Sequence, residues 1–219
     1  MRKLWLTTLL VLVASGAMAH EVWLERDGKN AQMFFGHWTM DMTENKDRLE
    51  MFKLDQLAPK DRVKKVERME KSIKLELASE GDVALTEVMK PRKSRLTPAV
   101  VQRVFLARAG RSETKNLLKL DLVPSAKNSN KMKVIFDGKP LAKQVVTLYG
   151  PHKWSKNFRS DDEGMVTLDT PWKGNYFADV RYTEEVKGEY EGVAFESKGY
   201  LLTLTFNVTE GIAWENAKK

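Results

Sequence analysis

The stretch HEVWLERDGKNAQMFFGH occupies residues 20–37 and holds two short apolar runs on either side of Asp27-Gly28-Lys29-Asn30. Two strand-forming runs that flank a short polar turn containing glycine predict a β-hairpin. Similar runs, with turn signals between them, recur toward the carboxyl end at Val145–Tyr149, Tyr176–Tyr182 and Tyr200–Val208. The pattern predicts an all-β protein built from β-sandwiches.

The register of this first hairpin decides whether two histidines meet. A turn centred on Gly28-Lys29, with a loop of two or four residues, places His20 directly opposite His37. Directly opposite residues have Cβ atoms about 4.5–5.5 Å apart, which is close enough for two imidazoles to share one ion. A two-residue turn at Asp27-Gly28 would instead shift the register and separate the histidines.

Residues 1–19 have the features of a secretory signal peptide. Two basic residues precede an apolar run, and Ala17-Met18-Ala19 fits the A-x-A cleavage pattern. Cleavage there makes His20 the first residue of the mature chain, with both a free α-amine and an imidazole. The apolar run is too short to span a bilayer, and no other stretch is long enough. We therefore expect a soluble protein exported to the periplasm.

Composition excludes several classes of function. The chain is 42% hydrophobic and 31% charged, as is ordinary for a globular protein, and it contains no cysteine. Disulfides, thiolate metal sites and cysteine nucleophiles are therefore impossible. The net charge of +7 accompanies no nucleic-acid-binding motif, so we expect no nucleic-acid partner. No G-x-S-x-G and no recognisable catalytic constellation occurs, and we expect that the protein is not an enzyme.

The chain divides into two expected modules after the signal. Residues 20–124 form a β-rich module that carries the candidate site, and residues 131–219 form a second β-sandwich. The polar segment Ser125–Lys131 is expected to link them. Within the first module, Lys60–Lys71 is expected to hold a helix because Pro59 suits a helix start. Alternating apolar residues predict a strand at Ile73–Leu77.

Three histidines are the candidate metal ligands: His20, His37 and His152. The α-amine and ring of His20 with the ring of His37 make a three-nitrogen histidine brace, which suits copper and also nickel. His152 lies in a loop of the second module and would add a third ring only if the modules meet. His37 has an alternative role as a packed histidine at a strand end. Glu21 and Glu25 lie on the opposite strand face and are expected to be solvated.

Several short motifs resemble a known family. HEVWLE at residues 20–25, Gly36-His37, FDGKPLA at residues 136–142 and Asp162-Glu163-Gly164 resemble the NikM-like periplasmic family of domains of unknown function associated with nickel and cobalt uptake. The resemblance covers most of the mature chain and is weakest over residues 45–111. It implies an Ig-like or transthyretin-like second sandwich, a divalent transition metal such as nickel or cobalt, and an inner-membrane metal transporter as partner.

These observations predict a periplasmic transition-metal-binding protein that is an accessory component of nickel or cobalt uptake. Two alternatives stay open. One is a copper-binding protein with a histidine brace. The other is a structural or adhesive exported β-sandwich in which the histidines have no metal role.

Overall fold

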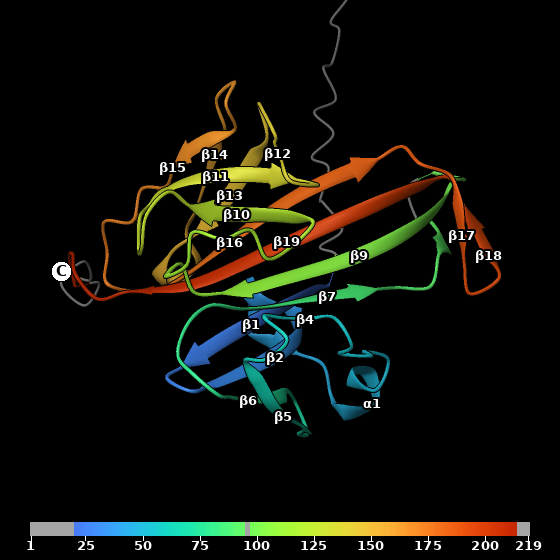
Figure 1. Cartoon of the computed structure of the whole chain (residues 1–219), viewed down its shortest axis with the longest axis horizontal. Coiled ribbons are helices and arrows are strands. Elements are labelled where there is room, and N and C mark those ends of the chain that lie inside the picture. Colours follow the sequence, from blue (N-terminus) through green and yellow to red (C-terminus); the bar gives the residue numbers. More distant parts are fainter. Residues whose placement is uncertain (1–19, 95–96, 214–219) are drawn as a thin grey trace, which may run out of the picture.

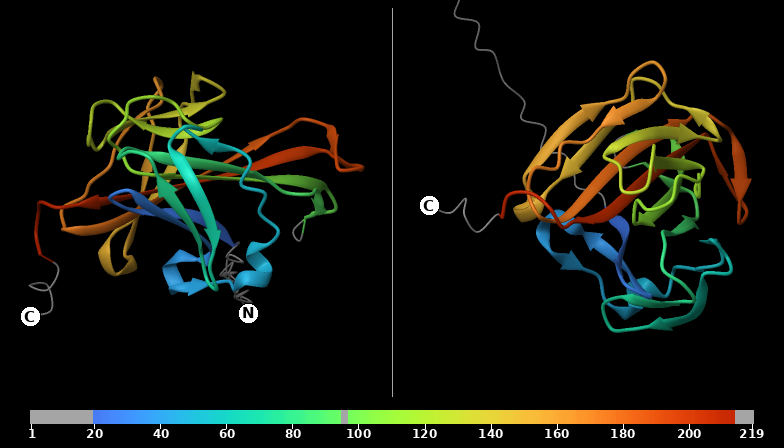
Figure 2. Two further views of the ribbon diagram at one scale, coloured as in Figure 1. Left: turned by 60° about the horizontal axis from the view of Figure 1, so that its bottom comes forward. Right: turned by 60° about the vertical axis from the view of Figure 1, so that its left-hand side comes forward.

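The computed structural model describes residues 20–94 and 97–213, and nearly all of its regular elements are strands (Figure 1). The all-β prediction is therefore confirmed. The expected signal peptide at residues 1–19 lies outside the described residues. Within them, three larger sheets stack as layers, which the views of Figures 1 and 2 show from three directions. No helix of the described part is both long and apolar enough to cross a membrane.

The first layer is a five-stranded antiparallel sheet that contains the predicted hairpin, at the bottom of Figure 1. Its path runs β1-β2-β6-β5, and the short β3 pairs with β2. The alternating burial of β6 matches the alternating sequence that predicted this strand. The strands are β1 (Glu21–Asp27), β2 (Asn30–His37), β3 (Met42–Thr43), β5 (Val63–Arg68) and β6 (Ile73–Leu77).

The middle layer is an eight-stranded sheet in the order β14-β13-β16-β19-β9-β7-β4, with β8 paired to β9. Near its centre, the neighbouring strands β19 and β9 run parallel. Strands from both halves of the chain therefore share one sheet. They are β4 (Leu57–Ala58), β7 (Val83–Val88), β8 (Arg92–Lys93), β9 (Val100–Ala109), β13 (Val145–Tyr149), β14 (Ser155–Arg159), β16 (Gly174–Glu184) and β19 (Ser197–Val208).

The third layer is a four-stranded sheet at the top of Figure 1. It contains β10 (Leu120–Pro124), β11 (Lys131–Phe136), β12 (Lys139–Pro140) and β15 (Met165–Thr167). A separate small hairpin is formed by β17 (Gly188–Tyr190) and β18 (Val193–Phe195). The helical turns of the described chain are short: η1 (Trp38–Met40), α1 (Lys46–Leu49) and η2 (Pro151–Lys153).

Two hydrophobic cores lie on the two faces of the middle sheet. Along β9, Val104 and Leu106 pack into the core shared with the four-stranded sheet. Phe105 and Ala107, which alternate with them, pack into the core shared with the five-stranded sheet. A strand covered on both faces needs apolar residues at successive positions. This requirement explains the continuous apolar run in this part of the sequence.

The strand pairing does not follow the expected division into residues 20–124 and 131–219. Ser125 donates its backbone N–H to the carbonyl of Lys131 at 2.9 Å, so the expected linker connects two paired strands, β10 and β11. The parallel pair β9–β19 then joins the two expected modules within one sheet. The two sandwiches consequently share their middle layer.

The expected helix at Lys60–Lys71 is wrong, because this segment contains the edge strand β5. The strand pairs antiparallel with β6, with a bulge between Val63 and Lys65. Arg68 anchors its end by donating to the carbonyl oxygens of Leu49 and Phe52, each at 2.6 Å. Exposed lysines and a bulge are common on edge strands, where they discourage pairing with other chains.

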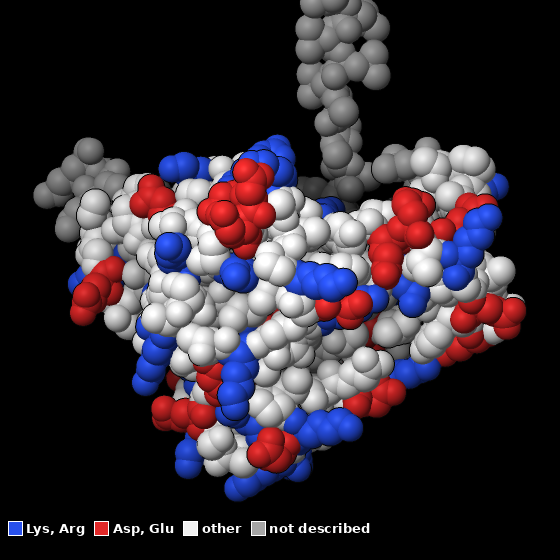
Figure 3. Space-filling model, turned by 45° about the horizontal axis from the view of Figure 1, so that its top comes forward, with Lys and Arg blue, Asp and Glu red and all other residues white. Residues whose placement is uncertain are grey.

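Charge is mixed on the face of the molecule that Figure 3 shows. Lysine and arginine side chains there lie between aspartate and glutamate side chains rather than in one patch. The net charge of +7 is therefore not concentrated on this face.

Candidate metal site

The hairpin β1–β2 brings His20 and His37 together. Its last ladder pair joins Asp27 to Asn30, so a two-residue loop connects the strands in the register predicted for a turn at Gly28-Lys29. The imidazole centroids of the two histidines lie 4.4 Å apart, with their planes inclined by 45°. Two rings at this separation are near enough to bind one ion after small rotations about their side-chain bonds.

A carboxylate that sequence reasoning missed contacts His20. Oε1 of Glu44 lies 2.5 Å from Nε2 of His20. Glu44 is held there by its backbone N–H, which donates to the carbonyl of Phe35 in β2 at 2.8 Å. No motif in the sequence pointed to Glu44, because only the return of the chain along β2 as β3 places it beside the histidines.

Gly36 allows this return of the chain. Its φ is +151°, and a Cβ built on it would lie 2.1 Å from the carbonyl oxygen of Met42. Only glycine permits a backbone approach this close. The Gly36-His37 pair, one of the motifs that resemble the NikM-like family, thus has a structural role in this chain: the glycine lets β3 carry Glu44 to His20.

The surroundings of His37 favour its neutral form. Its Nδ1 atom is buried and has no hydrogen-bond partner. Burial lowers the pKa of His37, and the nearby His20 lowers it further, while the carboxylate of Glu44 partly offsets both effects. A metal binds neutral imidazole, so a depressed pKa reduces the competition from protons. A buried ring nitrogen without a partner is also a group that a bound ion would satisfy.

The donor set fits a transition metal in one arrangement. Because Glu44 occupies Nε2 of His20, Nδ1 of that ring is left to bind metal together with the backbone nitrogen of the same residue. Ligating histidines commonly donate their other ring N–H to a carboxylate in this way. Among residues 20–94 and 97–213, no three His, Asp or Glu side chains are arranged to hold an ion. In the donor set expected from the sequence, the third nitrogen is the α-amine that cleavage after Ala19 would create.

His152 lies in the chain outside the hairpin that carries the paired histidines. It is an exposed residue of η2, with a φ of 60°. Its neighbour Lys153 docks on η1, with Nζ 3.3 Å from the ring centroid of Trp38 and 3.0 Å from Oδ1 of Asp41. The two modules do meet here, as a role for His152 requires, but within the described chain His152 does not complete a three-ligand group with His20 and His37.

Glu21 is buried, and the expectation that it is solvated is wrong. The residue is 4% exposed because β1 lies against the middle sheet, where Thr203 donates to the carbonyl of Val22 at 2.7 Å. Burial raises the pKa of Glu21 to about 7, with a smaller contribution from the nearby Asp179. Glu25 is exposed, as expected.

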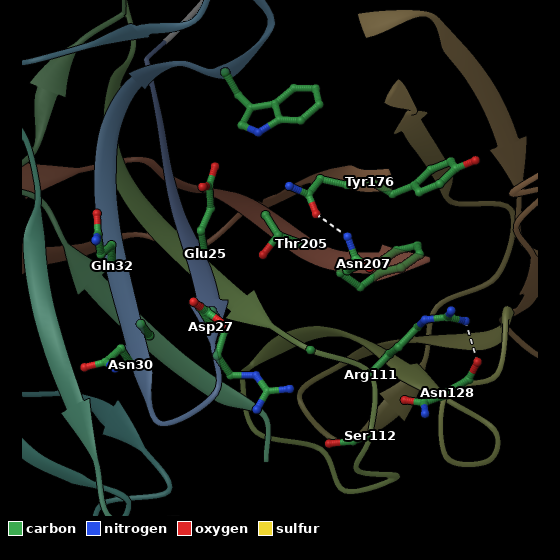
Figure 4. Close-up of a pocket in the computed structure, with 16 residues that line it drawn as sticks. Glu25, Asp27, Asn30, Gln32, Arg111, Ser112, Asn128, Tyr176, Thr205 and Asn207 are labelled. Carbon is green, nitrogen blue, oxygen red and sulfur yellow. Dashed lines mark hydrogen bonds between the residues drawn. The ribbon is translucent and has the colours of Figure 1, made fainter. Parts of the chain in front are cut away.

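A polar cleft lies on the other side of the hairpin (Figure 4). It has a volume of about 410 Å³ and is bounded by β1, β2, β16, β19 and the loop after β9. Two arginines, Arg26 and Arg111, and two carboxylates, Glu25 and Asp27, line the cleft, so the formal charges of these four side chains sum to zero. Several of its polar groups bond to one another, as Asn207 does to Asn175 at 2.7 Å. The cleft is lined by no histidine of the described chain and is separate from the histidine pair.

Comparisons with protein-family models, with curated proteins and with solved structures find no match to this chain. The assignment of a function therefore rests on the residues themselves and on their geometry.

Proposed function

We propose that this chain is a periplasmic protein that binds one divalent transition-metal ion through His20 and His37. The observation that carries the proposal is the hairpin register, which sets the two rings 4.4 Å apart beside a carboxylate that orients one of them. Three neutral nitrogen donors, namely the His20 amine and the two rings, form a ligand set that nickel, cobalt and copper all accept. His152 is a weaker candidate ligand, because it lies in a loop outside the pair.

The role in nickel or cobalt uptake rests on the family resemblance of the amino-terminal motif. In this proposal the protein receives the ion in the periplasm and presents it to an inner-membrane metal transporter. The histidine pair lies at the open end of the hairpin, where His20 is about one-third exposed, so an ion there is accessible to a partner. The protein has no catalytic role in this scheme.

Copper is the second candidate, and one observation favours it. Met42 pairs with His37 across the ladder of β2 and β3, and its side chain is 56% exposed. Thioether sulfur prefers Cu(I) over the harder divalent ions. Replacement of Met42 by leucine should therefore weaken Cu(I) binding and leave nickel binding unchanged.

Thermal unfolding with added metal tests the proposal. An ion that binds only the folded state raises the melting temperature by mass action. We expect nickel or cobalt to stabilise the exported protein that begins at His20. His37→Ala should remove most of this stabilisation, since it deletes one ring of the pair.

His152→Ala is the matched control, because it removes the third histidine of the chain and leaves the pair intact. This variant should keep most of the metal-induced shift. If nickel, cobalt and copper all leave the melting temperature of the processed protein unchanged, the metal proposal is wrong. The structural or adhesive β-sandwich then becomes the better account.

A further inference from the structure

A basic pocket lies directly beside the histidine pair. It has a volume of about 260 Å³, and both His20 and Phe35 form part of its wall. The rest of the wall comes from α1, from the chain around β8 and from β9. Five cationic side chains line it: Arg48, Lys90, Arg92, Lys93 and Arg103. No aspartate or glutamate is among the described residues that line this pocket.

The positive charge of the basic pocket is largely uncompensated. None of its five cations forms an ion pair with another residue of the described chain. Lys90 lies near enough to Glu191 to affect its carboxylate, but Glu191 already pairs with Lys53 at 2.7 Å. Glu44, hydrogen-bonded to His20, is the nearby carboxylate on the side of the histidines. Converging charges of one sign in a hollow attract small ions of opposite charge.

A bare dication is poorly suited to this position. The proposed ligands of the ion are neutral nitrogens, so they cancel none of its charge, and the neighbouring cations repel it. Three nitrogen donors also leave coordination positions open, which a further ligand can fill. An anion that ligates the metal and reaches into the basic pocket would remove both difficulties.

We propose that the metal ion is bound together with a small polycarboxylate, whose free carboxylates occupy the basic pocket. This inference rests on the proposed metal-binding function and names the chemical form of its ligand. Carboxylate oxygens coordinate divalent transition metals and also form bidentate hydrogen bonds with arginine. The volume of about 260 Å³ lies just below the usual range of pockets for drug-sized ligands, which suits a small anion and not a large organic chelator.

Calorimetric titration of the processed protein with nickel tests the inference, with and without citrate, at equal free nickel concentrations. Binding of nickel alone tests the proposed function, and the change on adding citrate tests the inference. We expect citrate to tighten nickel binding by about tenfold, within the usual range of coupling between two ligands. Nickel binding that citrate leaves unchanged would overturn the inference while the proposed function stands.

Neutralising the basic pocket should remove this coupling. The variant with Arg92→Gln, Lys93→Gln and Arg103→Gln changes only exposed side chains, so we expect it to fold. It should bind nickel alone at least as tightly as the wild type, because fewer neighbouring cations repel the ion, and citrate should tighten that binding by less than about twofold. An undiminished effect of citrate in this variant would overturn the inference.

Two controls separate specific binding from general effects of charge. The variant with Lys60→Gln, Lys127→Gln and Lys139→Gln removes the same charge from exposed positions on other elements and should retain the full effect of citrate. Phosphate tests whether charge alone is sufficient. If phosphate raises the affinity for nickel as much as citrate does, the assignment of a polycarboxylate is overturned.

Discussion

At the scale of single residues, Glu44 decides how His20 is presented. The hydrogen bond of 2.5 Å holds the Nε2 edge of the imidazole and directs Nδ1 away from the carboxylate. Glu44 acts through His20 and is therefore a positioning residue. Outer carboxylates of this kind raise the basicity of the ring and hold its tautomer.

Glu44→Ala should weaken metal binding by about 10–100-fold, the usual cost of losing such a partner. The fold should survive, since Glu44 is partly exposed and its backbone hydrogen bond to Phe35 remains. Calorimetric titration with nickel measures the change. Glu70→Ala, at an exposed carboxylate of the β5–β6 turn, should have no effect, and equal affinities for all three proteins would show that Glu44 has no such role.

The sequence predicted that His20 and His37 lie opposite each other, but it did not predict that Glu44 contacts His20. A hairpin is local, so the turn fixes which residues lie opposite one another. Glu44 depends on a glycine that accepts close backbone contact and on a short return strand of two residues. Strands this short leave no periodic pattern that a sequence can reveal.

At the scale of elements, β1 carries a buried carboxylate between two sheets. Oε1 of Glu21 lies 3.4 Å from Nη2 of Arg181 on β16, and Oε2 is buried without a hydrogen-bond partner. Asp179, on the same strand, is also buried and competes for Arg181, which it contacts at 3.1 Å. Tyr149 of β13 is a further titratable group near this cluster. The folded protein thus holds Glu21 where its charged form is disfavoured.

This burial predicts that stability falls as pH rises. The pKa of Glu21 is raised from 4.5 to about 7, so the folded state holds its proton over a range in which the unfolded state has lost it. Below pH 4.5 both states are protonated and no penalty exists; above pH 7 the penalty is complete, at about 3 kcal/mol. Glu21→Gln stays neutral and avoids the penalty.

Melting temperatures of the metal-free protein across pH 4 to about 8 measure the effect. The difference between Glu21→Gln and the wild type should grow from pH 4.5 to pH 7 and then stay constant. Glu163→Gln, at an exposed carboxylate in a loop, serves as the control and should give a flat difference. A flat difference for Glu21→Gln as well would mean that the carboxylate is solvated in solution.

The segment from Lys60 to Lys71 shows where local rules fail for an element. Proline at a helix start and the lack of a later breaker favoured a helix, but the segment forms β5 because β6 offers it a partner strand. Ile73–Leu77 was predicted correctly, since one face of that strand is buried and its apolar residues alternate. The exposed edge strand β5 has no such alternation to reveal it.

At the scale of the whole molecule, the shared middle sheet joins the two cores. Arg108 on β9 is fully buried and donates to Asp82 at 2.6 Å and to Asp121 at 3.0 Å. It also bonds to the backbone carbonyls of Glu113 and Lys115, and so fixes the connection between β9 and β10. One side chain thus ties together β7, β9 and the start of the four-stranded sheet.

Arg108→Met should destabilise the protein by about 3–5 kcal/mol, because it leaves two buried carboxylates without their partner. Since both cores pack on β9, unfolding should remain a single transition, with far-ultraviolet circular dichroism and tryptophan fluorescence changing together. Chemical denaturation followed by both signals measures the free energy of unfolding and shows whether the two signals change in one transition. Arg159→Met, at an exposed position of β14, should change stability little. Separated transitions would indicate two independent modules.

The sequence predicted the all-β class, but it did not predict that strands from the two halves of the chain pair within one sheet. Short strands with turns between them are local signals, whereas the parallel pairing of β9 with β19 connects residues about one hundred positions apart. The apolar run of β9 is typical of a strand that is buried on both faces, but the run does not indicate which strands pair with β9.

The most direct test of the metal assignment is to count the ions bound by the folded protein. Native mass spectrometry of the processed protein, beginning at His20, should show one nickel ion per chain. His37→Ala should show none, and His152→Ala should still show one. A wild-type protein that binds no ion, or a His37→Ala variant that binds as well as the wild type, would contradict the assignment of His20 and His37 as a metal site.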